Sequence, residues 1–380
     1  MPFSPLIKNL KSTLDGKFIE ESQGIKLKSK FDYDSGTLVM GYDYTTTNVK
    51  RDSLVTTDRS KFSDVSIDNF PIPPNLLGTL EGIVTIKNSF DISKDTHALY
   101  LLNNYNLTEK LALTTGLRYE YSKYNGYRNS FGNIKGYNLE NGGILFPNNN
   151  SNKILINDYT AIDKSTDNFA GEIGLNYKFS EVGSIYTRYE RGFISPLPSQ
   201  LTNKENQKYT NSNLKSETID SIEFGIKDVI DNSFITVSIF FSQTNNEIAT
   251  LDRNANNPAL KEWKFENIGQ TRRYGSEIFA QHYFDKLTLS ESITYIDAKI
   301  KKVNSNEWLK EGDKVPIVSK WKITLGADYK FNDKFSLGAT YVYNSSYEKR
   351  ELESYNKYKI SGFGVTDLIW KIQYKRLSNC

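Results

Sequence analysis

Apolar and polar side chains alternate residue by residue in many stretches of this chain. In Leu111–Tyr121, mostly apolar residues take every second position, and small, polar or charged residues such as Arg118 and Glu120 lie between them. The pattern recurs in Gly36–Tyr44, Ala170–Phe179, Asp220–Lys227, Lys322–Phe331, Phe335–Tyr343 and Thr366–Tyr374. A period of two predicts β-strands with one apolar face, and no helical period of useful length is present.

The connections between these stretches alternate strictly between short and long. The short ones contain Asp, Asn, Ser or Gly, which favour tight hairpin turns. The long ones are expected at about Thr45–Asp91, Ser122–Asp167, Pro196–Ser216, Asn245–Glu266, Lys301–Ser319 and Ser345–Tyr358. Consecutive antiparallel strands then place every short turn at one end of the sheet and every long loop at the other.

A soluble β-sandwich also alternates, with its apolar side chains facing inward. Three features favour an antiparallel transmembrane β-barrel instead. The strands run to roughly ten residues or more, as a tilted strand needs to cross a bilayer. Short turns alternate with long loops, and aromatic residues cluster near strand ends. We therefore expect an all-β barrel wall of about fourteen strands, whose apolar face contacts lipid while Arg118 and Glu120 face a hydrated lumen.

Composition narrows the possible functions. The chain has 48 basic and 45 acidic residues, a near balance that gives no indication of a nucleic-acid partner. It has one Cys, Cys380, and two His, His97 and His282, far apart in sequence. These offer almost no material for a metal site or for a nucleophile paired with a histidine, so we expect neither an enzyme nor a bound metal or cofactor. The first residues do not have the pattern of a signal peptide.

Several segments carry short motifs in a fixed order along the chain. These are Gly-x-Arg-x-Glu at Gly116, Arg118 and Glu120; a stretch with Phe193, Ser195 and Pro196; Leu-Lys-x-Glu at Leu214, Lys215 and Glu217; Glu-x-Gly at Glu223 and Gly225; and Asn-x-Gly followed by Gly-x-Glu at Asn267, Gly269, Gly275 and Glu277. Together they resemble the barrel domain of TonB-dependent outer-membrane receptors, which import ferric siderophores, haem and cobalamin. The resemblance runs from about Lys17 to Tyr374.

The resemblance implies a receptor for ferric siderophores in the outer membrane of a Gram-negative bacterium, in contact with outer-membrane lipid and lipopolysaccharide. Family barrels have 22 strands, short periplasmic turns and long extracellular loops, so residues 1–380 are expected to be an incomplete barrel domain. No plug domain is recognisable, and TonB would be reached only through a plug. We expect this chain not to transport alone. Alternatives are a haem or cobalamin receptor, or a non-transporting barrel or adhesin.

Candidate functional residues fall into two groups. Those expected to face the lumen and dock the plug are Arg118, Glu120, Glu217, Glu223 and Glu277. Those expected to bind ligand from the loops are Tyr124, Tyr127, Tyr137, Trp263, Arg272, Arg273 and Tyr347. Glutamates at alternating positions can equally be ordinary water-facing residues, and loop cations can contact lipopolysaccharide. Pro196–Ser216 contains no His, which disfavours haem.

Overall fold

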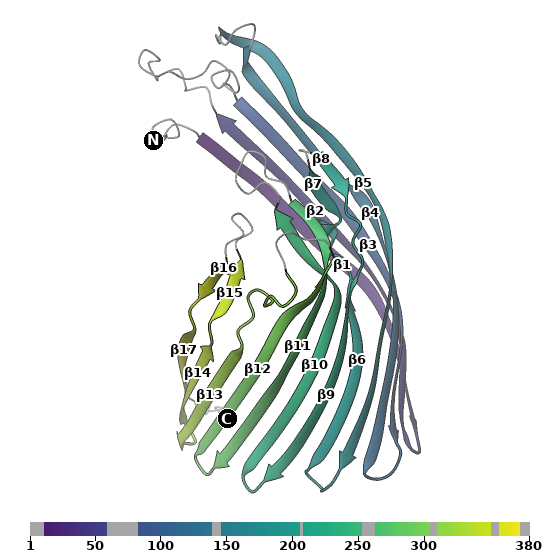
Figure 1. Ribbon diagram of the computed structural model, residues 1–380, viewed down its shortest axis with the longest axis vertical. Coiled ribbons are helices and arrows are strands. Elements are labelled where there is room, and N and C mark those ends of the chain that lie inside the picture. Colours follow the sequence, from purple (N-terminus) through teal and green to yellow (C-terminus); the bar gives the residue numbers. More distant parts are fainter. Residues whose placement is uncertain are drawn as a thin grey trace, which may run out of the picture.

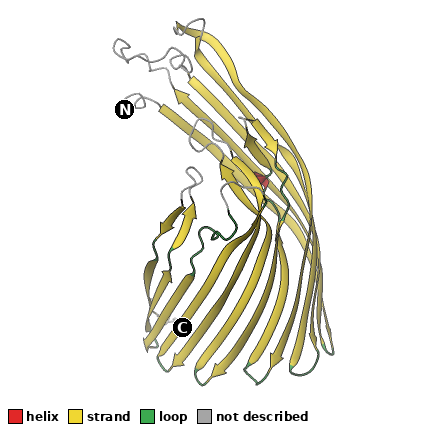
Figure 2. Ribbon diagram, in the orientation of Figure 1, coloured by secondary structure: helices red, strands yellow, loops and turns green. Residues whose placement is uncertain are grey.

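One curled antiparallel sheet forms most of the protein. The computed structural model describes residues 11–58, 83–138, 146–205, 208–252, 263–304, 310–350 and 357–372, nearly all in strands. The hydrogen-bonded path through these residues has thirteen strands, close to the expected number, in the order β1-β2-β3-β4-β5-β6-β9-β10-β11-β12-β13-β14-β17. Figure 1 shows the sheet curling around an interior, and Figure 2 shows how little of it is helical.

The strands of the path differ in length. Their bounds are β1 (Lys11–Tyr33), β2 (Gly36–Asp58), β3 (Ile83–Asn106), β4 (Leu111–Asn138), β5 (Phe146–Lys178), β6 (Ser184–Ile194), β9 (Glu217–Ile230), β10 (Ser233–Asp252), β11 (Trp263–Phe284), β12 (Leu287–Val303), β13 (Trp321–Asn332), β14 (Phe335–Asn344) and β17 (Phe363–Ile372). Among the described residues, no helix is long and apolar enough to cross a membrane.

Hairpins joined by short turns account for half of the connections, as expected. The turns after β1, β3, β5, β9, β11 and β13 contain two to five residues, and Figure 1 shows them together at the lower end of the sheet. In the turn after β9, Asp231 takes a φ of 50°, a left-handed conformation that Asp adopts more readily than most residues. The plan of tight turns at one end and long connections at the other is therefore confirmed.

The strands continue far beyond the positions where loops were expected. Residues from Thr45 to Asp58, from Ser122 to Asn138 and from Asn245 to Asp252 belong to β2, β4 and β10. The expected long loops were therefore too long. Apolar alternation ends where one face stops being apolar, but the backbone ladder continues because neighbouring strands satisfy each other's N–H and C=O groups whichever side chains they carry.

The two faces of the sheet differ in character. Large apolar side chains are exposed on the convex face, where Leu99, Leu117, Ile173, Ile222, Ile239 and Leu325 are examples. The residues between them, such as Arg118 and Glu223, lie on the concave face. Exposing so many apolar side chains to water would be unfavourable. The band of apolar side chains on the convex face, the apolar band, is therefore the surface that a membrane would cover.

Smaller elements lie off the main path. The connection from β6 to β9 contains the short helix η3 (Pro198–Gln200) and the strands β7 (Thr202–Glu205) and β8 (Lys208–Asn211), and β15 (Tyr347–Arg350) pairs with β16 (Lys357–Ile360). The buried apolar residues form two clusters where connections fold onto the concave face. The protein interior is therefore built by these connections and not by a second sheet.

Candidate functional site

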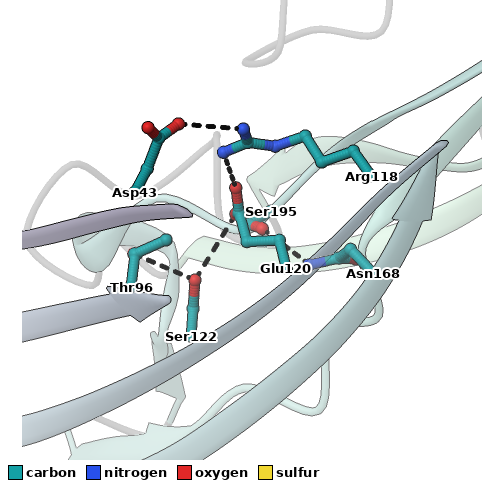
Figure 3. A network of polar contacts seen from close by, with 7 residues as sticks. All are labelled: Asp43, Thr96, Arg118, Glu120, Ser122, Asn168 and Ser195. Atoms are coloured by element: carbon teal, nitrogen blue, oxygen red, sulfur yellow. Dashed lines mark hydrogen bonds and ion pairs between the residues drawn. The ribbon is translucent and has the colours of Figure 1, made fainter. Parts of the chain in front are cut away.

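A charged network lies on the concave face of β2, β3 and β4, and Figure 3 shows it from close by. The Arg118 guanidinium donates to Asp43 Oδ2 at 3.1 Å and to Glu120 Oε2 at 3.0 Å. Ser122 donates to Glu120 Oε1 at 3.5 Å and shares a hydrogen bond of 3.1 Å with Thr96 Oγ1. Since Glu120 is only 9% exposed, Arg118 supplies the opposite charge that a buried carboxylate requires.

The connection between β6 and β9, residues 195–216, crosses the concave face, and we call it the strap. Figure 1 shows its strands β7 and β8 inside the curve of the sheet. At its start, Asn168 Nδ2 donates to Ser195 Oγ at 3.0 Å (Figure 3), and the fully buried Tyr124 donates from Oη to the Pro196 carbonyl at 2.9 Å. The strap is therefore attached directly beside the charged network.

Apolar and cationic side chains hold the middle of the strap. A buried cluster from β2 to β5 packs against the strap; it consists of Val49, Phe90, Ile92, Tyr124, Ile162 and Leu201. The Arg128 guanidinium lies 4.3 Å from the centre of the Tyr209 ring and 5.7 Å from that of Phe90, and donates to Thr202 Oγ1 at 3.0 Å. Such cation–π contacts favour a fixed position for the strap.

Two partly desolvated lysines lie beside the strap, one contacting Tyr124 and the other the strap itself. The Lys94 ammonium lies 5.4 Å from the centre of the Tyr124 ring, and Lys164 Nζ donates to the Leu214 carbonyl at 2.6 Å. These residues lie on the loop side of the apolar band. Burial lowers the pKa of Lys94 and of Lys164 and raises the pKa of Tyr124 to about 12, because a charged group loses hydration there.

The far end of the strap reaches a different part of the sheet. Lys204 in β7 pairs with the start of β11, and the Phe265 amide donates to Asn203 Oδ1 at 2.8 Å. Asn267, also on β11, accepts from the Lys215 amide at 2.8 Å and donates to the Lys215 carbonyl at 3.0 Å. The strap thus joins the β3–β5 wall to the β11 wall across the concave face.

A second polar cluster lies on the concave face of β10 and β11. Arg273 Nη1 donates to Thr244 at 3.0 Å and to Thr271 at 2.7 Å, and Arg273 Nη2 lies 3.3 Å from both carboxylate oxygens of Glu247. Thr271 also donates to Glu247. Arg273 is therefore oriented by three neighbours, Thr244 and Glu247 on β10 and Thr271 on β11.

Glu217 borders this cluster at the first residue of β9. Its Oε1 accepts the Ile248 amide at 2.8 Å, and burial, together with the charge of Glu247, raises the pKa of its carboxyl. Between them lies a cavity of about 210 Å³, lined by Phe193, Ile194, Glu217, Ile219, Thr244, Glu247 and Arg273. Here a cation and two carboxylates border open space, whereas the cations under the strap are covered.

A larger cavity of about 560 Å³ is lined by residues from β2 to β9. Its polar lining includes Asp43, Arg118, Glu172, Glu190 and Arg191. The charged network and the larger cavity are therefore continuous, and they give the concave face a polar hollow with charges of both signs.

The residues expected to face the lumen all lie on the concave face. Arg118 and Glu120 are in the charged network, and Glu217 borders the smaller cavity. Glu223 accepts from Tyr186 Oη and lies 3.7 Å from Arg188 Nη2. Glu277 lies opposite the buried Ser238 in the register of β10 and β11. Their role in docking a plug remains a prediction.

The residues expected in ligand-binding loops lie on strands instead. Tyr124, Tyr127 and Tyr137 belong to β4; Trp263, Arg272 and Arg273 to β11; and Tyr347 to β15. The loop placement was wrong because these strands extend past the apolar band. The side chains of Tyr137 and Trp263 lie outside the described part.

The structure does not bring these seven residues together. Tyr124 is buried under the strap, and Tyr127 stacks on Tyr159 with ring centres 5.7 Å apart. Neighbouring strand residues face opposite sides, so Arg273 faces the smaller cavity while Arg272 lies on the convex face, where its Nε donates to Gln243 Oε1 at 2.9 Å. Of the predicted ligand residues, only Arg273 lines one of the concave cavities described above.

Sequence reasoning missed the strap anchors Arg128 and Lys164, and it missed Lys94, which contacts the anchor Tyr124. No motif marks them, although each follows the inward-facing alternation of its own strand. Among the described residues, no group of three or more His, Cys, Asp or Glu side chains could hold a metal ion.

Comparison with known proteins places this geometry in a family. The family model described as "TonB dependent receptor-like, beta-barrel" matches residues 9–378. The chain belongs to the TonB-dependent receptor β-barrel family. Members of this family are receptors and transporters of the Gram-negative outer membrane, not enzymes. The fold predicted from alternation and motifs is thereby confirmed.

This chain matches only part of the length of each relative. The chain is 25% identical over 255 residues to the "Probable TonB-dependent siderophore receptor PiuA" of Acinetobacter baumannii, covering 63% of this chain and 30% of that protein. The ferric yersiniabactin uptake receptor FyuA of Yersinia pestis superposes with a TM-score of 0.63 at 13% identity, covering 95% of this chain and 47% of FyuA.

The copper transporter OprC has a TM-score of 0.64 at 16% identity, covering 94% of this chain and 49% of OprC. At these identities the superpositions show the fold alone, and the chain spans about half of each solved structure. Since proteins named for different cargoes share the fold, the cargo of this chain must be argued from its own residues.

Proposed function

We propose that this chain forms wall and loops of a receptor for ferric siderophore complexes in the outer membrane of a Gram-negative bacterium. The observation that carries the proposal is the sequence similarity to a protein named as a siderophore receptor, within a match to the family over residues 9–378. The apolar convex face would contact lipid, and the polar concave face would enclose the route of the ligand.

The concave charges fit the docking of a plug domain. The charged network and the larger cavity present Asp43, Arg118, Glu172 and Glu190 to the interior. Charges of both signs on a concave surface suit a polar protein partner, because complementary charges fix orientation more than they add affinity. A plug docked there would also carry the contact with TonB.

Arg273 is the cation best placed to meet an anionic ferric complex. Its side chain is 25% exposed at the smaller cavity, and Thr244, Thr271 and Glu247 hold its orientation. Arg128 and Lys164 instead contact the strap, and Lys94 contacts the ring of Tyr124. The smaller cavity that Arg273 borders lies on the β9–β11 side of the wall and is open to a ligand.

Binding of radioactive iron complexes tests this function. The chain is produced in the outer membrane of a Gram-negative host that lacks its own siderophore receptors, and ferric catecholate and ferric hydroxamate are titrated. We expect saturable binding of one class, weakened about tenfold in Arg273→Gln, the loss typical of a charged hydrogen bond. Lys322→Gln is the control: Lys322 lies on β13 and faces the concave side, as Arg273 does, and this variant should bind normally. Saturable binding of haem, cobalamin or copper alone would overturn the proposal.

A further inference from the structure

The smaller cavity is too small to enclose a ferric siderophore complex. Its volume of about 210 Å³ lies below the roughly 300–1,000 Å³ of pockets that enclose whole drug-sized ligands. An iron complex with three bidentate chelating groups is at least as large as such a ligand. The cavity therefore has room for one arm of a ligand, while the iron centre stays outside it.

The walls of the smaller cavity are partly apolar. Ile194 and Ile219 line it together with Phe193, and Ile194 lies directly opposite Glu217 in the register of β6 and β9. Ile194 is 58% exposed, so an alkyl chain in contact with it would remove apolar surface of both partners from water. The lining therefore favours an arm made of methylene groups over a bare ion.

The lining carries one more negative charge than positive charges. Arg273 and Glu247 form an ion pair in which Arg273 Nη2 lies 3.3 Å from both carboxylate oxygens, so these two charges compensate each other. Glu217 is the second carboxylate, and its Oε1 accepts the Ile248 amide. Within the described part of the chain, no cation lies within ion-pair distance of Glu217.

The carboxylate of Glu217 is therefore short of positive charge in a partly dehydrated place. Burial, together with the charge of Glu247, raises the pKa of its carboxyl, because an ionised group that loses hydration requires an opposite charge or hydrogen bonds. A carboxylate can accept about four hydrogen bonds, and the described residues donate one to Glu217. A cation with N–H groups that entered the cavity would supply both the charge and the missing donors.

We propose that the smaller cavity binds a primary ammonium group at the end of an alkyl arm of the ferric siderophore. The ammonium donates to the carboxylate of Glu217, and the methylene groups of the arm contact Ile194 and Ile219. Arg273, at the same cavity, meets the negatively charged oxygens that chelate the iron. This inference rests on the proposed function and names a chemical feature of its ligand.

Other cations fit the smaller cavity less well. A metal ion requires several ligands, and among the described residues no group of three or more His, Cys, Asp or Glu side chains could hold one. A guanidinium binds best to a carboxylate with both oxygens open, whereas Glu217 Oε1 already accepts an amide. An ammonium directs its three donors separately and needs only one oxygen from each acceptor.

Two iron complexes that differ at a single amine test the proposal. Ferrioxamine B is a linear ferric trihydroxamate with a free primary amine at one end, and acetylation converts that amine into an uncharged amide. Both complexes carry radioactive iron and are titrated onto the chain in the outer membrane of a Gram-negative host that lacks its own siderophore receptors. We expect wild type to bind the amine complex about tenfold more tightly than the acetylated complex, which corresponds to about 1.4 kcal/mol.

Glu217→Gln shows whether this preference comes from the cavity. Glutamine keeps the oxygen that accepts the Ile248 amide but carries no charge, so we expect it to bind both complexes as wild type binds the acetylated one. Asp328→Asn is the matched control, since it removes a carboxylate from the concave face of β13, away from the cavity, and it should keep the wild-type preference. Equal binding of the two complexes by wild type, or a preference that persists in Glu217→Gln, would overturn the proposal.

The iron-free forms of the same two compounds separate this inference from the proposed function. If neither ferric complex binds, calorimetry with the iron-free amine and its acetylated form on the purified chain measures the cavity by itself. A preference for the amine that Glu217→Gln removes then supports the ammonium site although the ligand assignment fails, and no preference overturns both. If the ferric complexes bind without a preference for the amine, the ammonium site fails and the ligand assignment stands.

Discussion

The two walls joined by the strap use the same residue types for different purposes. On the β3–β5 wall, Tyr124, Lys94 and Arg128 contact the strap or its buried neighbours. On the β9–β12 wall, Arg273 and Glu217 border a cavity. The first three side chains lie under the protein's own strap, whereas Arg273 and Glu217 border open space.

The contrast teaches that residue type alone does not identify a ligand site in such a barrel. Aromatic and cationic residues are what an anionic iron complex would require, and both walls have them. A half-buried cation already bound to a backbone carbonyl, as Lys164 is to Leu214, has little left to offer a ligand. Accessibility after the strap is in place decides which of them can bind.

Removing the anchor under the strap should have the largest effect. Tyr124→Ala deletes a fully buried ring and leaves the Pro196 carbonyl without its donor, so we expect a loss of about 3–5 kcal/mol in stability. Thermal unfolding and protease cleavage within residues 195–216 report it. Tyr124→Phe keeps the ring and should lose only about 1 kcal/mol. An alanine variant with wild-type protease resistance would contradict the role of this residue as an anchor.

A glycine in the second wall should be nearly as sensitive. Gly269 has a φ of 134°, and an added Cβ would meet the Lys302 carbonyl. We expect Gly269→Ala to cost about 1–3 kcal/mol in unfolding free energy. Gly16→Ala on β1, where the nearest atom to the new Cβ is 3.7 Å away, is the control. Equal stability of the two variants would show that the backbone at Gly269 does not require glycine.

Replacing one arginine in each wall by glutamine, in separate variants, compares the two walls directly. We expect Arg128→Gln to reduce stability by about 1–3 kcal/mol and to expose the strap to protease, with the affinity of the remaining folded protein for iron complexes unchanged. Arg273→Gln should do the reverse, weakening ligand binding about tenfold at nearly constant protease resistance. Titration and proteolysis on both variants decide this, and identical profiles would erase the distinction between the walls.

The smallest effect is expected at Glu217. Its raised pKa means that the folded protein disfavours the ionised carboxylate, so wild-type stability falls as pH rises through the folded-state pKa. Glu217→Gln should therefore be more stable than wild type at neutral pH, by less than about 1 kcal/mol. At a pH below the ordinary pKa of 4.5, this difference in stability should vanish, because the side chain at position 217 is then uncharged in both proteins. Denaturant unfolding across this pH range measures it.

Much of the fold could be predicted from local chemistry. Alternation around Leu117 and Arg118 gave the two faces of β4, and Asp and Ser turns such as Asp34–Ser35 gave the hairpins, because both are local properties of neighbouring residues. The Glu-x-Gly and Asn-x-Gly motifs correctly marked β9 and β11. These signals need no knowledge of distant contacts.

The strap and the extended strands could not be predicted in this way. Lys164 is identified as an anchor only by the carbonyl of Leu214, 50 residues away in sequence. Beyond the apolar band, both faces of β4 carry polar residues, with Ser122, Arg128 and Ser130 on the concave face and Lys123, Asn125 and Asn129 on the convex face. The contrast between the faces is therefore lost, although the backbone ladder continues. Contacts between distant segments carry no local pattern, and therefore the candidate ligand site was placed on the wrong elements.

The central claim is that the convex face of this sheet contacts lipid and the concave face contacts water. Spin labels placed one at a time at Glu172, Ile173, Leu175 and Asn176 of β5, with Cys380 replaced by Ser, test it in the membrane-inserted chain. The account predicts that labels at positions 173 and 175 collide mainly with lipid-soluble oxygen, and labels at 172 and 176 with a water-soluble nickel complex. Labels at 173 and 175 that are shielded from oxygen, as in the core of a soluble sandwich, would contradict it.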